Sequence, residues 1–181
     1  MAKNEVLEPF HGHKHDHGHC IDEALQAADA ICSAAGARLT PLRKHVLEMV
    51  WQSHEPVGAY DLLDTLHDEG TEKRRAAPPT VYRALEFLLK HGLIHRIESL
   101  NAYVGCGEPH NFHGAQFLIC QDCGSVAELD DHDIAKTISQ KAKRQGFQVE
   151  QQMIEILGLC PSCQIVDTSS NRKVETVRHA S

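Results

Sequence analysis

Two cysteine pairs of the C-x-x-C form are the strongest chemical signal in the sequence. Cys120 and Cys123 precede Gly124, and a gap of thirty-six residues separates them from Cys160 and Cys163. Four thiolates in two such pairs are the usual ligands of a structural zinc ion, and a following glycine lets backbone N–H groups face sulfur. A redox-active C-x-x-C would come singly, at a strand-to-helix junction. We therefore predict a structural zinc held by these four cysteines, with strands and a helix inside the gap.

A second group of possible ligands lies upstream of the first pair. His95, Cys106, His110 and His113 supply imidazole and thiolate groups, both of which suit zinc. Taken alone, the histidines could equally be ordinary surface residues. Residue type and spacing therefore indicate a further metal site here without deciding its ligands.

The first twenty residues are rich in histidine. His11, His13, His15, His17 and His19 alternate with Gly, Lys and Asp and end at Cys20, and nothing there can build a core. A flexible tail that collects zinc weakly and a disordered polar leader without function fit this composition equally well.

Composition limits the class of protein. The chain has 181 residues, 41% of them hydrophobic, which is enough for one or two small domains. The sequence contains no long apolar run and no signal peptide, so we expect a cytoplasmic protein with reduced thiols. The net charge of −7 is uneven, with nine bases and nine acids in residues 36–100. Charge therefore neither requires nor excludes nucleic acid.

The hydrophobic periodicity predicts an α+β protein. We expect helices over about 22–35, 41–53, 59–69 and 79–91, followed by strands at 94–97 and 102–104. Short helices followed by a hairpin are typical of a winged helix, whose last helix enters the major groove of DNA. A helical bundle that only packs is the alternative.

The second half predicts a small α/β domain. Strand candidates at 116–119, 126–129 and 148–157 surround a helix at about 133–145. The expected organisation is a disordered leader at 1–20, the winged helix at 21–104, a hinge at 105–115, the zinc-containing domain at 116–166 and a disordered tail at 167–181.

Several motifs together resemble a known family. RLTP at 38–41, AYDLL at 59–63, PPTVYRAL at 78–85 and FLICQDCG at 117–124, with the later C-x-x-C, are similar to the ferric uptake regulator family and, within it, the zinc uptake regulator branch. The resemblance covers roughly residues 20–165. It implies a homodimeric repressor with an N-terminal winged helix, a C-terminal dimerisation domain and a palindromic double-stranded operator.

The resemblance also implies particular site residues. A second, sensing zinc would be held by His95, Cys106, His113 and Glu128, which makes two Zn²⁺ ions per chain. DNA contacts would come from Tyr60, Thr80, Tyr82 and Arg83. Arg83 suits a guanine edge, Thr80 a phosphate, and either tyrosine could instead be a packing residue.

The function predicted in this way is zinc-dependent repression of zinc uptake genes, with no catalysis, no small-molecule substrate and no membrane partner. Four protein ligands leave no open position for the water of a zinc hydrolase. Two alternatives remain, namely sensing of iron or another metal within the same family and zinc buffering without DNA. The stretch before Cys120 has only His110 and His113, fewer ligands than iron-type members of the family carry there, which argues against a third site built on His110. The sequence does not decide whether His110 or His132 forms a third site.

Overall fold

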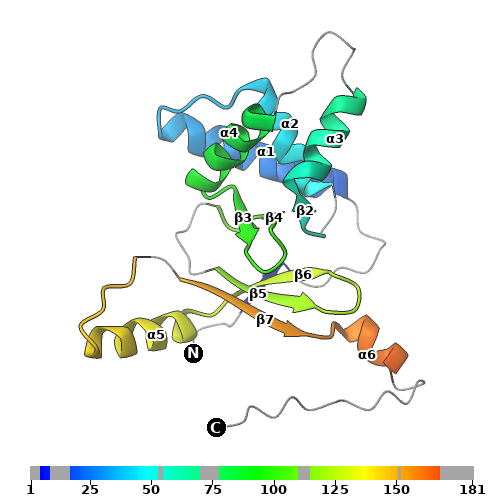
Figure 1. Ribbon diagram of the computed structural model, residues 1–181. Coiled ribbons are helices and arrows are strands. Elements are labelled where there is room, and N and C mark those ends of the chain that lie inside the picture. Colours follow the sequence, from blue (N-terminus) through cyan, green and yellow to red (C-terminus); the bar gives the residue numbers. More distant parts are fainter. Residues whose placement is uncertain are drawn as a thin grey trace.

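The computed structural model describes residues 5–8, 17–52, 55–69, 78–109, 115–150 and 152–167. Figure 1 shows two stacked parts, with a group of helices above, a sheet below and a β-hairpin pointing from the upper part to the lower one. The predicted leader and the tail fall mostly outside the described residues, as do residues 110–114 of the predicted hinge.

The upper part is a winged helix. Its elements are α1 (His17–Ala34), α2 (Pro41–Trp51), β2 (Val57–Gly58), α3 (Ala59–Glu69), α4 (Pro78–Lys90), β3 (Ile94–Ile97) and β4 (Ala102–Gly105). The strands form an antiparallel sheet in the order β2-β4-β3. The predicted hairpin is present, so the alternative of a helical bundle without a wing is wrong. Strand β2 was not predicted, because two residues are too few to show a period.

Local chemistry explains where two of these helices begin. Thr40 caps α2 by accepting a hydrogen bond from the backbone N–H of Arg43 at 3.4 Å, and Pro41 occupies the first turn. Helix α1 begins at His17, whereas the sequence predicted a start at Asp22. The earlier start follows from packing, since Cys20 and Ile21 also lie against the core of the upper part.

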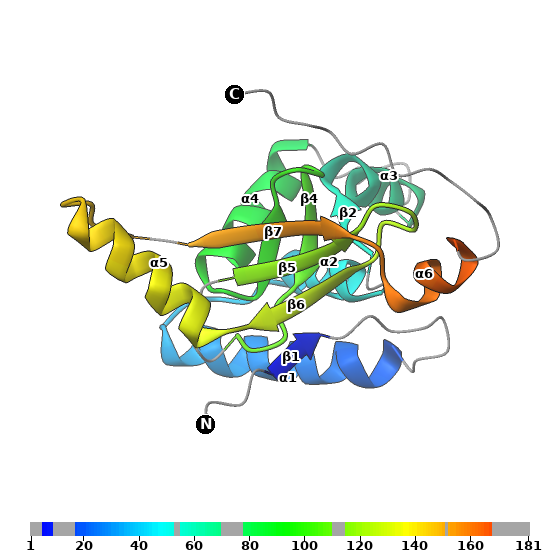
Figure 2. The same cartoon turned by 90° about the horizontal axis from the view of Figure 1, so that it is seen from below.

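The lower part is a four-stranded sheet. It contains β1 (Glu5–Glu8), β5 (Ala115–Cys120), β6 (Val126–Asp130) and β7 (Met153–Gly158), in the order β1-β6-β5-β7 (Figure 2). Helix α5 (His132–Arg144) connects β6 to β7, and α6 (Pro161–Asp167) follows β7. The prediction that the whole leader lacks structure is wrong at both β1 and the first turn of α1, because β1 gains backbone hydrogen bonds from β6.

The connection through α5 makes β7 parallel to β5. The carboxylate of Asp131 caps α5 by accepting the N–H groups of Asp133 at 2.9 Å and Ile134 at 3.1 Å. Parallel pairing then places Cys120 opposite Gly158. The two cysteine pairs are thereby brought to the same end of the sheet.

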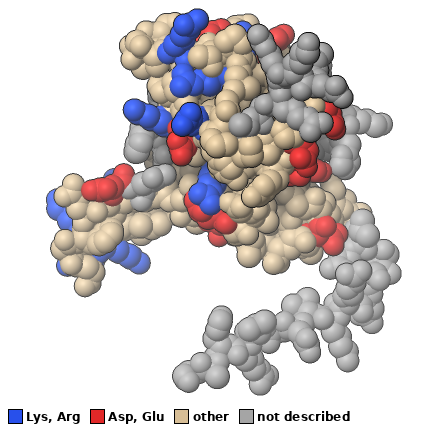
Figure 3. All heavy atoms as spheres, turned by 45° about the horizontal axis from the view of Figure 1, so that its top comes forward, with Lys and Arg blue, Asp and Glu red and all other residues tan. Residues whose placement is uncertain are grey.

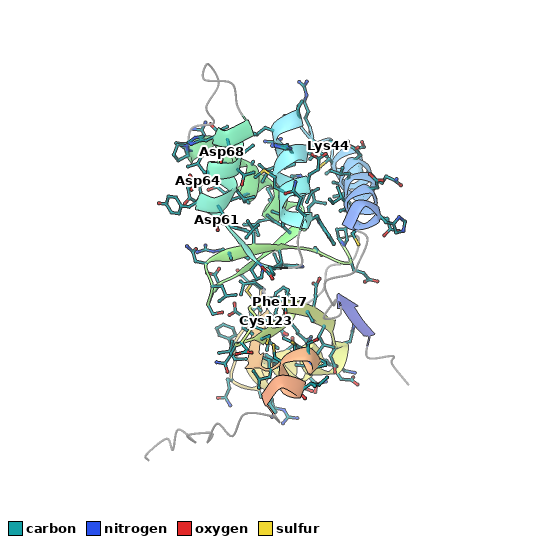
Figure 4. The ribbon with its side chains drawn as sticks, turned by 90° about the vertical axis from the view of Figure 1, so that its right-hand side faces the viewer. Lys44, Asp61, Asp64, Asp68, Phe117 and Cys123 are labelled. Carbon is teal, nitrogen blue, oxygen red and sulfur yellow. The ribbon has the colours of Figure 1, made fainter. Side chains whose placement is uncertain are left out.

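The wing shares a hydrophobic core with the lower sheet. Ile97 and Val104 of the wing are buried in one cluster with Phe117 and other residues of β5 and β6. Figure 4 shows Phe117 in the sheet directly below the hairpin. The hairpin is therefore the structural link between the two parts. Among the described residues, no helix is long and apolar enough to cross a membrane.

Candidate metal centres and nucleic-acid interface

The four predicted structural ligands come together at one end of the lower sheet. Sulfur atoms of Cys120, Cys123, Cys160 and Cys163 all lie within 4.8 Å of one another. The sulfurs of Cys123 and Cys160 are 3.8 Å apart. Such a cluster of thiols, with no disulfide among the described cysteines, has the composition of a tetrahedral zinc site.

Backbone N–H groups prepare this cluster for a cation. Gly124 adopts φ +75°, which closes the turn through its N–H to the carbonyl of Cys120 at 3.0 Å. The N–H of Cys160 donates to the sulfur of Cys120 at 3.3 Å. Burial raises the pKa of Cys120, but backbone N–H groups of Cys123, Cys160 and Asp122 donate to its sulfur and lower the pKa to about 6. Cys120 is therefore held as a thiolate near neutral pH, the form that ligates zinc.

Three of the four predicted sensing ligands also meet. His95 from β3, Cys106 just after β4 and Glu128 from β6 offer ligand atoms within 4.8 Å of one another. His95 Nε2 lies 3.0 Å from Glu128 Oε1. The three residues come from the wing, the hinge and the lower sheet, so a cation bound by them would join both parts of the molecule.

Burial and charge show that this second set fits a cation. Glu128 and Cys106 are only 2% and 3% exposed. The other oxygen of Glu128 accepts the N–H of Gly107 at 3.0 Å. Burial lowers the pKa of His95, but hydrogen bonds with Cys106 and Glu128 outweigh it and raise the pKa to about 9. The buried carboxylate is thus compensated by a proton on His95, and a divalent metal ion that displaces this proton would supply the same positive charge.

The remaining predicted ligands are placed only in part. His113 and His110 lie outside the described residues. His132 is exposed at the start of α5 and belongs to neither cluster. The structure thus assembles seven of the eight predicted ligands and leaves His113 as a prediction.

The predicted DNA-reading residues lie on exposed surfaces of the winged helix. Helix α4 buries Val81, Ala84, Leu85 and Leu88 and turns Thr80, Tyr82 and Arg83 outward. Tyr60 at the start of α3 is 70% exposed and Tyr82 is 40% exposed, so neither tyrosine is a core residue. An exposed helix that is followed by a wing in this way can enter a major groove of DNA.

Charge is distributed unequally over the upper part. Figure 3 shows Lys and Arg side chains gathered toward its upper left. Asp61, Asp64 and Asp68 instead point away from α3 on one side (Figure 4). Phosphate attraction therefore favours the side that carries the basic groups.

Several supporting groups were not foreseen in the sequence. The Phe117 ring packs edge-on against His95 with centroids 5.3 Å apart, and Ser125 Oγ lies 3.0 Å from the sulfur of Cys123. Phe117 stood in a recognised motif, but its contact with the wing depends on how the two parts dock. No local pattern could have indicated it.

A winged helix tied through its wing to a sheet, with one cluster of four thiols and a second of imidazole, thiol and carboxylate, is the architecture of a metal-responsive DNA-binding regulator. The protein-family model of the ferric uptake regulator family matches residues 34–157. The chain belongs to this family.

Relatives and solved structures agree with that membership. The zinc uptake regulation protein of Escherichia coli (strain K12) is 38% identical over 161 residues, which cover 87% of this chain and 90% of the relative. A solved zinc uptake regulator complexed with zinc and DNA superposes with a TM-score of 0.76 at 38% identity, over 82% of this chain and 97% of that one. Holo XcZur gives a TM-score of 0.73 at 41% identity, over 80% and 99% of the two chains.

Proposed function

We propose that this chain is a zinc-responsive transcriptional repressor that binds palindromic operator DNA as a homodimer and controls zinc uptake genes. The names of its relatives and its likeness to a regulator solved with zinc and DNA support this function. The repressor acts in the cytoplasm, catalyses no reaction and needs no small-molecule substrate.

One observation carries the proposal. His95, Cys106 and Glu128 converge from the wing, the hinge and the lower sheet. Holding these three groups together fixes the orientation of the hairpin, and α4 precedes that hairpin directly in the chain. With His113 as the fourth ligand, bound zinc supplies a redox-inert cross-link that selects the DNA-binding orientation. The thiolate of Cys106 favours zinc over iron or manganese, which prefer more oxygen ligands.

The remaining metal assignment is structural. Cys120, Cys123, Cys160 and Cys163 would hold a second zinc, giving two ions per chain. These residues fasten β5 to the end of β7, where Gln121 N–H donates to the carbonyl of Gly158 at 2.9 Å. The role of this site is to keep the sheet intact whether or not the sensing residues are occupied.

The lower part has the surface of a dimerisation domain. Strand β7 is an edge of the sheet. Large apolar side chains are exposed on β7, on helices α5 and α6, and on the segments that join them to β7, at Ile138, Phe147, Ile156, Leu157, Leu159 and Ile165. Apolar surface of this kind beside an open edge is buried when two copies associate. A two-fold dimer presents two copies of α4 and therefore reads a palindrome.

Operator binding with and without zinc tests the function. The probe is a duplex selected from random sequence by the zinc-loaded protein, compared with a scrambled duplex at two salt concentrations. Cys106→Ser should abolish the zinc dependence. Cys32→Ser is the matched control, because Cys32 is equally buried, at 2%, yet lies in the helical core outside both clusters. Zinc-dependent binding by the Cys106 variant would contradict the assignment of the sensing site.

Metal content tests the stoichiometry. Protein purified without added metal should hold two zinc ions per chain, of which mild chelation removes one. Retention of the dimer after that step separates the structural site from the sensing site. A chain that holds zinc but never discriminates between the two duplexes would instead be a zinc buffer.

A further inference from the structure

A carboxylate of the lower sheet accepts hydrogen bonds from the tip of the wing. Glu155, in the middle of β7, accepts the backbone N–H of Glu98 at 2.7 Å through Oε1. The same carboxylate accepts the N–H of Ser99, at 3.4 Å for Oε1 and 3.2 Å for Oε2. Glu98 and Ser99 begin the turn between β3 and β4, and more than fifty residues separate them from Glu155 along the chain.

The turn is shaped so that these two N–H groups point outward. Asn101 adopts φ +48°, and its own N–H closes the turn on the carbonyl of Glu98 at 3.2 Å. The Glu98 side chain is directed elsewhere, to Arg96 at 3.4 Å. Burial raises the pKa of Glu155, but hydrogen bonds from Ser99 and from the backbone of Glu98 lower it below its ordinary value. The acceptor is therefore a charged carboxylate, which hydrogen-bonds more strongly than a neutral group.

Glu155 and the sensing ligands hold opposite ends of the same wing strand. His95 lies near the start of β3 and Glu98 follows its end, so the two attachments are about 10 Å apart at the usual rise per residue. One attachment lets a strand pivot, whereas two fix its direction. Between them, buried Ile97 supplies the apolar contact with the sheet. On another side of the turn, Leu100 lines a cleft of about 290 Å³ together with Gly124 of the lower part.

We propose that Glu155 is a positioning residue for the metal switch, acting through the wing. Its carboxylate holds the wing tip on the lower sheet in the orientation that lets the sensing ligands converge. This inference rests on the proposed function, because it concerns the same change of orientation. Removing the carboxylate lowers the population of the competent orientation, and the apparent affinities for zinc and for operator fall together.

A graded pair of variants tests the role. Glu155→Ala removes both carboxylate oxygens that accept these hydrogen bonds. With the four-cysteine site filled, operator binding should weaken by about tenfold, the order of magnitude expected for loss of a hydrogen bond to a charged group. Glu155→Gln keeps one carbonyl oxygen and should lose about threefold, a partial rescue expected of a weaker neutral acceptor. Affinity for the sensing zinc, titrated without DNA, should fall in the same order. Glu150→Ala removes the same charge from an exposed position outside the wing contact and should behave as wild type.

A direct readout separates positioning from general loss of structure. The amide protons of Glu98 and Ser99 should move upfield in the NMR spectrum of Glu155→Ala, while the melting temperature, dimer and four-cysteine zinc stay as in wild type. Unmoved amide signals would show that the contact is not made and would overturn the proposal. Moved signals with wild-type affinities for zinc and operator would overturn the positioning role.

The outcome also distinguishes this proposal from the function on which it depends. If wild-type protein shows no zinc-dependent operator binding, the proposed function fails. Glu155 then keeps a positioning role only if its alanine variant both shifts the two amide signals and weakens the second zinc. Wild-type affinity in that titration overturns it.

Discussion

Replacing Gly105 by alanine is expected to destabilise the winged helix and to disturb the sensing site. Gly105 ends β4 and directly precedes Cys106. A Cβ atom at this position would meet the indole of Trp51, at 2.5 Å from Cζ2, at 2.6 Å from Nε1 and closer still to Cε2. Such separations are far inside van der Waals contact, so either the ring or the strand has to move.

The size of the effect follows from how tightly the ring is held. Trp51 is only 7% exposed and belongs to the core to which all four helices α1 to α4 contribute. Overpacking a rigid core costs typically about 1–3 kcal/mol. For a domain of this size, each kcal/mol lowers the melting temperature by about 4–8 °C. Displacement of β4 also moves the sulfur of Cys106, so affinity for the sensing zinc should fall while the four-cysteine site keeps its ion.

Gly158→Ala is the matched control. Gly158 also ends a strand, but a Cβ atom there would meet nothing within 4 Å. Its melting temperature should change little, because surface substitutions usually stay within about 0.5 kcal/mol. Two measurements on both variants test this expectation, namely thermal unfolding monitored by circular dichroism and titration of the sensing site with zinc. A Gly105→Ala protein that melts with wild type and binds the sensing zinc normally would refute the reasoning.

Three further predictions concern the two metal sites and the DNA interface. Cys123→Ser should lose the fold of the lower sheet or the dimer, since structural zinc contributes on the order of 10 kcal/mol, and a normally melting dimer would contradict this. Arg83→Ala should cost about 1–3 kcal/mol of discrimination between operator and scrambled duplex, whereas Lys90→Ala, which removes an exposed base from the last turn of the same helix, should weaken both alike in a salt titration. The pKa of His95 is about 9 against an ordinary 6.5. In protein without the sensing metal, the pairing of His95 with its partners therefore stabilises the fold fully below about pH 6.5. This stabilisation is lost as the pH rises through about 9. Melting curves across that window should show the loss in wild type and a smaller loss in Glu128→Gln, which keeps the hydrogen bond between His95 and Cys106, and a flat wild-type profile would contradict it.

Elements with a long period or a clear cap could be predicted from the sequence. The helix expected from residue 41 is present as α2, which Thr40 caps, and the helix expected over 79–91 is present as α4. The cysteine spacing indicated a thiol cluster that the parallel pairing of β5 with β7 indeed assembles. In each case the signal is local, or a repeated ligand type carries it.

Features that depend on docking of the two parts could not be predicted. Strand β1, Glu5–Glu8, precedes the histidine-rich run, is too short to show a period of its own and pairs with the edge of β6. Glu155 looks like any polar residue of a strand until the wing turn approaches it. Glu128 was assigned by resemblance alone, because an acidic residue in a short strand does not reveal the largely buried histidine beside it.

The parallel pairing of β5 with β7 also determines the order in which the protein can mature during synthesis. All elements of the winged helix precede residue 106, so that part can fold while the ribosome is still translating the rest. In the lower sheet, β5 can pair with β6 first, but its pairing with β7 has to wait for Met153–Gly158, and the thiol cluster has to wait for Cys163. Long-range pairing of this kind is slow to form. A nascent chain therefore carries a finished DNA-binding domain before it has a complete sheet against which the wing can be held.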